Sequence, residues 1–259
     1  MKKLIVANWK MKPSSLKEAK KIFNEIKKVA SKLKKVDTVI CPPFVYLPAL
    51  GDSVSKQTWR LSLQVGAQDI FYEDKGAFTG EISVMMVKNL GANYVIIGHS
   101  ERRKYLGETN EIINKKIKTA LKNNLKVIFC VGEQERDIEG NYLYFIKNEI
   151  EEGLKGISRK LFKNLIIAYE PIWAIGKKGE DADNSEDIFQ MSIYIRRVLL
   201  GIVGKELSRT IFIIYGGSVE PENAESLLKE GGTQGFLVGH ASLVPKNFNK
   251  ILKIAQNIK

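Results

Sequence analysis

Short apolar runs alternate with longer amphipathic stretches along the whole chain. The apolar runs are rich in Val, Ile and Leu with few polar positions, a pattern typical of parallel strands that are buried on both faces. We expect eight strands, at residues 4–8 (LIVAN), 37–42 (DTVICP), 61–68 (LSLQVGAQ), 93–98 (NYVIIG), 126–132 (KVIFCVG), 164–170 (NLIIAYE), 210–216 (TIFIIYG) and 235–239 (GFLVG).

The stretches that follow the strands repeat apolar residues at helical spacing. In residues 15–34, for example, Ile22, Phe23 and Ile26 fall on one helical face while lysines fill much of the rest. We expect eight helices, near residues 15–34, 44–56, 82–90, 108–124, 141–156, 185–204, 221–230 and 245–257.

Strict alternation of strands and helices predicts an α/β fold with parallel strands joined by helical crossovers. Eight such units in 259 residues favour a closed (β/α)8 barrel. The alternative is an open doubly wound sheet. Its usual G-x-G-x-x-G signature is absent, because the first strand ends in Asn-Trp-Lys. No internal linker is evident, so we expect one domain over residues 1–259.

The formal net charge of +12 favours anionic partners, either nucleic acid or small phosphorylated molecules. The lysine-rich helical faces carry no interleaved aromatic residues to stack bases, which argues against nucleic acid. No stretch approaches the roughly 20 apolar residues of a membrane span. Cys41 and Cys130 each end an apolar run and make no disulfide framework, so we expect reduced thiols and a cytoplasmic protein.

Polar residues end several of the predicted strands, and a barrel gathers these ends on its ligand-binding face. Asn8 and Lys10 are two residues apart, so both can face the barrel mouth. A lysine there would be a fixed cation for an anionic substrate. An ordinary surface lysine is an equally good interpretation of this residue taken alone.

His99 follows an apolar run and a glycine, in a chain with two histidines. A packed core histidine is one interpretation. The other is a catalytic group, because backbone amides of the turn that starts at Ser100 could donate to one ring nitrogen and keep the ring neutral. A Ser-His hydrolase is a poor alternative without a G-x-S-x-G motif. His99 and His240 lack the spacing of metal ligands, and no metal site is expected.

Glu170 ends the sixth apolar run and precedes Pro171. It could be a salt-bridge partner, or a carboxylate base at the barrel mouth. The segment that follows, PIWAIGKKGEDAD, mixes apolar, charged and glycine residues and is a plausible lid that excludes water. Two glycine-rich strand ends, residues 215–219 (YGGSV) and 239–242 (GHAS), fit a phosphate site formed by backbone amides.

Nine short motifs extend this interpretation over nearly the whole chain. They are ANWKM, CPPF, VGAQD, GAFTGEIS, IIGHSERR, FCVGE, AYEPIWAIG, YGGSV and GFLVGHASL. In these motifs and their order the sequence closely resembles the triosephosphate isomerase family. The resemblance implies a cofactor-free isomerase that interconverts dihydroxyacetone phosphate and D-glyceraldehyde 3-phosphate through an enediolate, in glycolysis and gluconeogenesis.

The resemblance also assigns residues. It implies that Glu170 is the base, that His99 is the electrophile, and that Lys10 and Asn8 stabilise the enediolate. The residues that it implies for the remaining roles are Gly176, Ser218, Gly239 and His240 for phosphate, Ile175 and Leu237 for an apolar clamp over the base, Ser100 and Glu101 as supports, and Thr79 on a loop that enters the partner of a homodimer.

Four segments depart from the family pattern. The lid continues with residues 177–181 (KKGED), which are longer and more charged than usual; His240 replaces a glycine; Gln234 replaces an acidic residue; and residues 52–63 are a few residues longer. These departures leave open a catalytically impaired barrel that binds a phosphorylated metabolite or an anionic partner. An aldolase lacks support, because no lysine ends the sixth run.

Overall fold

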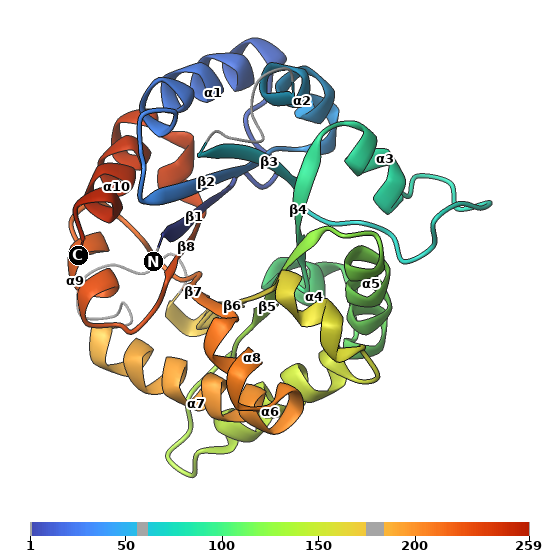
Figure 1. Cartoon of the computed structure of the whole chain (residues 1–259), viewed down its shortest axis with the longest axis vertical. Coiled ribbons are helices and arrows are strands. Elements are labelled where there is room, and N and C mark those ends of the chain that lie inside the picture. Colours follow the sequence, from blue (N-terminus) through green and yellow to red (C-terminus); the bar gives the residue numbers. More distant parts are fainter. Residues whose placement is uncertain (1, 56–61, 175–183, 259) are drawn as a thin grey trace.

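The computed structural model describes residues 2–55, 62–174 and 184–258, and its centre is a closed barrel of eight parallel strands (Figure 1). Each strand pairs with the next along the chain, and the last pairs with the first. The barrel predicted from sequence is confirmed, and the open-sheet alternative is wrong. The strands are β1 (Lys3–Asn8), β2 (Val36–Cys41), β3 (Leu63–Ala67), β4 (Ala92–Ile97), β5 (Lys126–Val131), β6 (Leu165–Tyr169), β7 (Phe212–Tyr215) and β8 (Gly235–Val238).

Helices surround the barrel on its outer face (Figure 1). The α-helices are α1 (Leu16–Ala30), α2 (Leu47–Ser55), α3 (Val84–Asn89), α4 (Ser100–Leu106), α5 (Asn110–Lys122), α6 (Asn141–Leu154), α7 (Ser185–Val203), α8 (Lys205–Thr210), α9 (Ala224–Lys229) and α10 (Pro245–Asn257). The 3-10 helices are η1 (Phe44–Tyr46), η2 (Arg159–Asn164), η3 (Ile172–Ala174) and η5 (His240–Leu243). The sequence did not predict α4 and α8, because these helices have only seven and six residues, are mostly polar and show no apolar periodicity.

The strands are apolar on both faces because each face packs against a different core. In β1, Leu4 and Val6 belong to a cluster of buried residues that fills the barrel, whereas Ile5 and Ala7 pack outward against the helices. Alternate side chains of a strand point to opposite sides of the sheet. A strand buried on both sides therefore shows a continuous apolar run rather than an alternating one.

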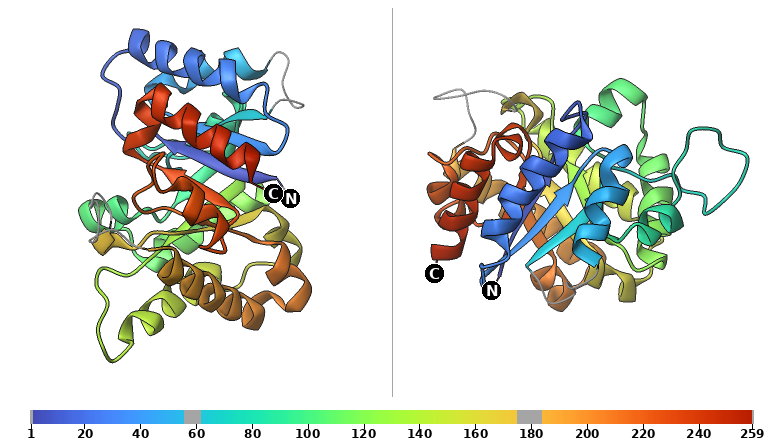
Figure 2. Two further views of the ribbon diagram at one scale, coloured as in Figure 1. Left: turned by 90° about the vertical axis from the view of Figure 1, so that its left-hand side faces the viewer. Right: turned by 90° about the horizontal axis from the view of Figure 1, so that it is seen from above.

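Helix α1 illustrates how the outer layer forms. The Ser15 side chain caps its first turn by accepting a hydrogen bond from the Glu18 amide, at 3.2 Å. Its apolar face is buried, and most of its lysines point to solvent. Helix α10 lies beside α1 (Figures 1 and 2), and the Asn249 amide of α10 donates to the Glu25 carbonyl of α1.

Positive charge is concentrated at the two chain ends, which these helices bring together. Residues 1–35 and 245–259 contain 16 lysines and two glutamates, an excess of 14 charges against a net charge of +12 for the chain. The rest of the sequence is therefore slightly acidic. Within the described ranges, none of the lysines of α1 and α10 forms an ion pair with a carboxylate.

Gln234, which replaces an acidic residue, has a structural role before β8. Its side-chain oxygen accepts from the Ile213 amide at 2.8 Å and from Arg196 Nη2 at 3.3 Å. Arg196 also donates to the carbonyls of Ser208 and Ile211. A neutral amide is thus enough to accept from Arg196, because the guanidinium also donates to two backbone carbonyls.

Among the helices that the structure describes, none combines the length and the apolar character that crossing a membrane requires.

Candidate active site

The carboxyl end of β1 carries two polar side chains that face the barrel mouth. Asn8 is buried as the last residue of the strand, and its side-chain oxygen accepts a hydrogen bond from the Lys10 amide at 3.1 Å. Lys10 has a φ of 52°, in the left-handed region that non-glycine residues rarely adopt. Strained backbone of this kind persists where surrounding contacts hold it, and such contacts are present here.

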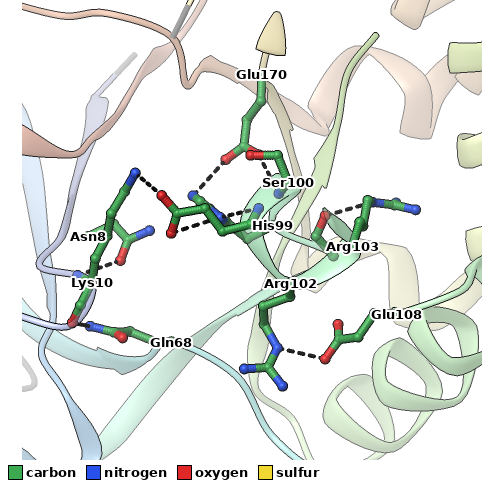
Figure 3. Close-up of polar contacts among 11 residues, drawn as sticks. Asn8, Lys10, Gln68, His99, Ser100, Arg102, Arg103, Glu108 and Glu170 are labelled. Atoms are coloured by element: carbon green, nitrogen blue, oxygen red, sulfur yellow. Dashed lines mark hydrogen bonds and ion pairs between the residues drawn. The ribbon is translucent and has the colours of Figure 1, made fainter. Parts of the chain in front are cut away.

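Gln68 supplies those contacts, and sequence reasoning did not single it out. Its side-chain nitrogen donates to the Lys10 carbonyl at 2.8 Å and to the Cys41 carbonyl at 2.9 Å. Gln68 follows β3, so one side chain fastens together the ends of the first three strands (Figure 3). The only signal in the sequence was its place at the polar end of an apolar run.

The Lys10 ammonium points toward the centre of the site, where it pairs with Glu101. Lys10 Nζ and Glu101 Oε1 are 2.5 Å apart, with the two side chains 35% and 45% exposed. A pair this exposed contributes little to stability. Its value here is that it holds a cation at the barrel mouth, within reach of an anionic substrate.

His99 caps the amino end of α4. Its Nδ1 accepts a hydrogen bond from the Glu101 amide at 3.2 Å, as expected from the turn that follows the strand. An accepting Nδ1 places the ring proton on Nε2, so the imidazole is neutral and is a donor at Nε2. The side chain is 10% exposed and Nε2 faces the carboxylate of Glu170.

Glu170 follows β6 and is almost completely buried. Its Oε2 accepts a hydrogen bond from the Ser100 amide at 3.1 Å, and its Oε1 lies 3.5 Å from His99 Nε2 (Figure 3). The amide belongs to the first turn of α4, whose partial positive charge favours a carboxylate. Burial, followed by the nearby Glu170 carboxylate, raises the pKa of the Cys130 thiol well above its usual value. The thiol is therefore a neutral neighbour of the carboxylate.

Glu133 holds the segment that leads from Glu170 toward the lid. One of its carboxylate oxygens accepts from the Tyr169 hydroxyl and from the Trp173 indole N–H, both at 2.8 Å. Its backbone carbonyl also accepts from the Ile172 amide. The short η3 helix is thus anchored to the turn after β5.

The two glycine-rich strand ends lie beside different residues of the site: Gly216 is next to Glu170, and Gly239 is next to Lys10. A Cβ built on Gly239 would be 3.5 Å from Lys10 Cε, so the Gly239 backbone passes close to the ammonium-bearing side chain. His240 begins η5 and is exposed. Non-glycine residues with positive φ in the described ranges are Lys10 and Asn124, so His240 fits this turn without backbone strain. The Ser218 hydroxyl donates to the Ala174 carbonyl at 3.4 Å.

The remaining predicted residues are less closely joined to this cluster. Leu237 is buried inside the barrel with Cys130. Thr79 is exposed on the loop between β3 and α3, and this loop projects from the barrel (Figures 1 and 2). Ile175, Gly176 and residues 177–181, like residues 56–61, lie outside the described residues.

The described residues contain no group of three or more His, Cys, Asp or Glu side chains that could hold a metal ion. The site instead gathers one buried carboxylate, one neutral imidazole, one ammonium and glycine backbone. This set suits proton transfer on an anionic substrate.

Comparison with known proteins gives a consistent result. The family model for triosephosphate isomerase matches residues 3–255. A triosephosphate isomerase of Thermoanaerobacter pseudethanolicus is 43% identical over 96% of this chain and 98% of its own length. Those of Dictyoglomus thermophilum and Thermodesulfovibrio yellowstonii are 42% and 45% identical, each over 97% of this chain and 99% of their own length. The chain belongs to the triosephosphate isomerase family.

Proposed function

We propose that the protein interconverts dihydroxyacetone phosphate and D-glyceraldehyde 3-phosphate without a cofactor. The observation that carries the proposal is the arrangement around Glu170. Its carboxylate is fixed by the Ser100 amide and faces the donor nitrogen of His99, and Lys10 is anchored at the same barrel mouth. The impaired-barrel alternative is not favoured, because these residues are all in place.

Glu170 acts as the base in this proposal. It removes a proton from the substrate carbon beside the carbonyl and returns it to the neighbouring carbon, so the reaction is balanced by proton transfer alone. His99 donates from Nε2 to the carbonyl oxygen and helps move the hydroxyl proton. A neutral donor can both give and regain this proton at modest cost.

Lys10 and Asn8 stabilise the negative charge that develops on the enediolate. Preorganised donors act on such charge without having to reorient during the reaction. The ion pair between Lys10 and Glu101 keeps the ammonium in position before substrate binds. Ser100 supports Glu170 through its amide, and Glu101 supports His99 in the same way.

The phosphate group is held beyond the ends of β7 and β8, by Ser218, the amides of Gly239 and His240, and Gly176 of the lid. The closeness of Gly239 to Lys10 supports this location, because one cation then serves both ends of a small substrate. Ile175 and Leu237 form the apolar clamp over the base, which keeps it dry and basic.

A coupled steady-state assay with glyceraldehyde 3-phosphate tests the function. We expect fast turnover by the purified chain, because Lys10, His99 and Glu170 lie together at the barrel mouth. A variant in which residues 177–181 carry the shorter family lid is expected to turn over within about tenfold of the parent, since the barrel holds the base. An inactive parent whose activity the family lid restores would support the impaired barrel instead and would locate its defect in residues 177–181. Inactivity of both would contradict the isomerase itself.

We also propose a homodimer in which Thr79 approaches Asn8 and Lys10 of the partner subunit. The projecting loop is exposed over residues 73–81, and several large apolar side chains are exposed in this chain. They include Phe78 (43%) on this loop, Met85 (43%) and Met86 (55%) on α3, Met11 (94%) after β1 and Val45 (77%) in η1. Isolated apolar residues are common on surfaces, but a group of this kind is typical of an interface.

A Thr79→Asp variant is expected to weaken the dimer and to lower kcat by about tenfold or more, because a carboxylate would enter an apolar interface beside Lys10. Sedimentation velocity and the coupled assay measure both effects. Glu139→Asp, at an exposed position elsewhere, is the control. A Thr79→Asp protein that remains a fully active dimer would exclude this loop from the interface.

We place the protein in the cytoplasm as a single domain over residues 1–259, with no nucleic-acid or membrane partner. The free thiols support a reducing compartment: Cys41 and Cys130 are buried and unpaired, and burial raises the pKa of both. The pairing of β8 with β1 supports one domain, because both chain ends contribute to the same barrel.

A further inference from the structure

A buried ion pair lies behind Glu170 and takes no part in the reaction as described so far. Arg103 Nη1 of α4 and Glu149 Oε1 of α6 are 3.1 Å apart, with the side chains 17% and 3% exposed. Arg103 also donates to the Gly98 carbonyl at 2.8 Å and to the Cys130 carbonyl at 3.3 Å. It therefore joins the carboxyl ends of β4 and β5.

Glu149 reaches the backbone that supports the base. Its second oxygen accepts from the Gly132 amide at 2.9 Å. Gly132 packs so tightly against Glu170 that a Cβ built on it would lie 1.8 Å from the Glu170 carbonyl oxygen. Glu149 thus fixes the segment against which the backbone of the base rests. Burial raises the pKa of Glu149 to about 7, while Arg103 and the Gly132 amide oppose that rise.

The space between these groups is a narrow crevice lined by Gly98, Arg103, Cys130, Gly132 and Glu170, with no room for a water molecule among these described residues. Charges separated by such a dry space interact strongly. The titratable and charged groups around Glu170 are His99, Cys130, Arg103, Glu149 and Glu133. Glu101 contacts His99 and pairs with Lys10.

We propose that Glu149 and Arg103 are positioning residues of the isomerase reaction. Glu149 holds Arg103 and Gly132 in place beside Glu170 and so positions the base. Its negative charge also balances that of Arg103, so that Glu170 stays a strong base. The inference rests on the proposed function. Without that balancing charge, the Arg103 guanidinium favours the ionised form of Glu170, which then takes up a proton less readily.

The test compares kcat and KM of the parent and a Glu149→Gln variant between pH 5.5 and pH 8.5. Glutamine keeps the volume and an acceptor for the Gly132 amide but cannot ionise. At pH 8.5, where Glu149 is ionised in the parent, we expect the variant's kcat to be lower by about three- to tenfold with little change in KM. At pH 5.5, where Glu149 is protonated in the parent, the two kcat values should nearly coincide.

This pH dependence separates positioning from a structural role. A merely structural loss would lower kcat by the same factor at every pH, and that result would overturn the proposal, as would equal kcat values at pH 8.5. Glu108→Gln is the matched control, because Glu108 is also buried and pairs with Arg102 at 2.6 Å and Lys116 at 2.5 Å. Any loss in this control should be independent of pH.

A second variant keeps the test decisive if Glu149→Gln does not fold. Glu149→Asp retains an ionisable group, so its kcat is expected to rise through neutral pH as that of the parent does. A Glu149→Asp profile without that rise would overturn the proposal. An inactive parent enzyme would instead contradict the proposed function, and the parent's own assay reveals that case before any variant is compared.

Discussion

Shortening the proposed base in a Glu170→Asp variant is expected to reduce kcat by about two orders of magnitude while the fold stays intact. The loss of one methylene withdraws the carboxylate from the Ser100 amide, now at 3.1 Å, and moves it relative to His99 Nε2, now at 3.5 Å. A displacement of about 1 Å is enough to misalign a proton transfer. The coupled assay gives kcat, and thermal unfolding followed by circular dichroism reports on the fold.

The same substitution at a surface glutamate serves as the control. Glu225→Asp on α9 alters an exposed ion pair with Lys229, so turnover and stability should both stay close to those of the parent. A folded Glu170→Asp enzyme with unchanged turnover would refute the assignment of the base.

A single methyl group at Gly132 is expected to reduce kcat by about 100-fold and to lower the free energy of unfolding by about 1–3 kcal/mol. A Cβ there would lie 1.8 Å from the carbonyl oxygen of Glu170 and 3.2 Å from its Cα. Backbone atoms cannot give way as a flexible side chain can, so the strand end that carries Glu170, the proposed base, must move. Denaturant unfolding and the coupled assay on Gly132→Ala measure the two effects.

Gly201 provides the contrasting glycine. It lies within α7, and a Cβ built on it meets no atom within 4 Å. Gly201→Ala should leave kcat unchanged and raise the free energy of unfolding by about 0.5–1 kcal/mol, because alanine favours a helix. Equal effects of the two substitutions would show that crowding against Glu170 is not what makes Gly132 sensitive.

The barrel could be predicted because the burial of its strands on both faces is visible in the sequence as continuous apolar runs. A run such as Ile166-Ile167-Ala168 is apolar at consecutive positions, which fits only a strand covered on both faces. The short helix α4 could not be predicted in this way. Its sequence, SERRKYL, shows no apolar period, and its start depends on a cap supplied by the His99 side chain.

The site residues likewise fall into those that the sequence could predict and those that it could not. Asn8, Lys10, His99 and Glu170 stand at the ends of apolar runs, so fold and sequence together place them at one face. Gln68, Arg103 and Glu149 were missed because their significance lies in contacts between distant segments. Glu149 is on an outer helix, and nothing in its local sequence indicates that it turns inward to the Gly132 amide.

Because β1 and β8 pair to close the barrel, β1 lacks one of its two neighbouring strands until β8 has been synthesised. Strand β8 begins more than two hundred residues after β1 ends. At common translation rates, β8 therefore leaves the ribosome about 10 to 50 seconds after β1. During that interval an apolar strand edge is open to wrong partners. Lys2 and Lys3 at the start of β1, and the lysines of α1, place positive charge near this edge. Charged residues that flank an apolar strand oppose such pairing, so we expect these lysines to disfavour it until β8 is available.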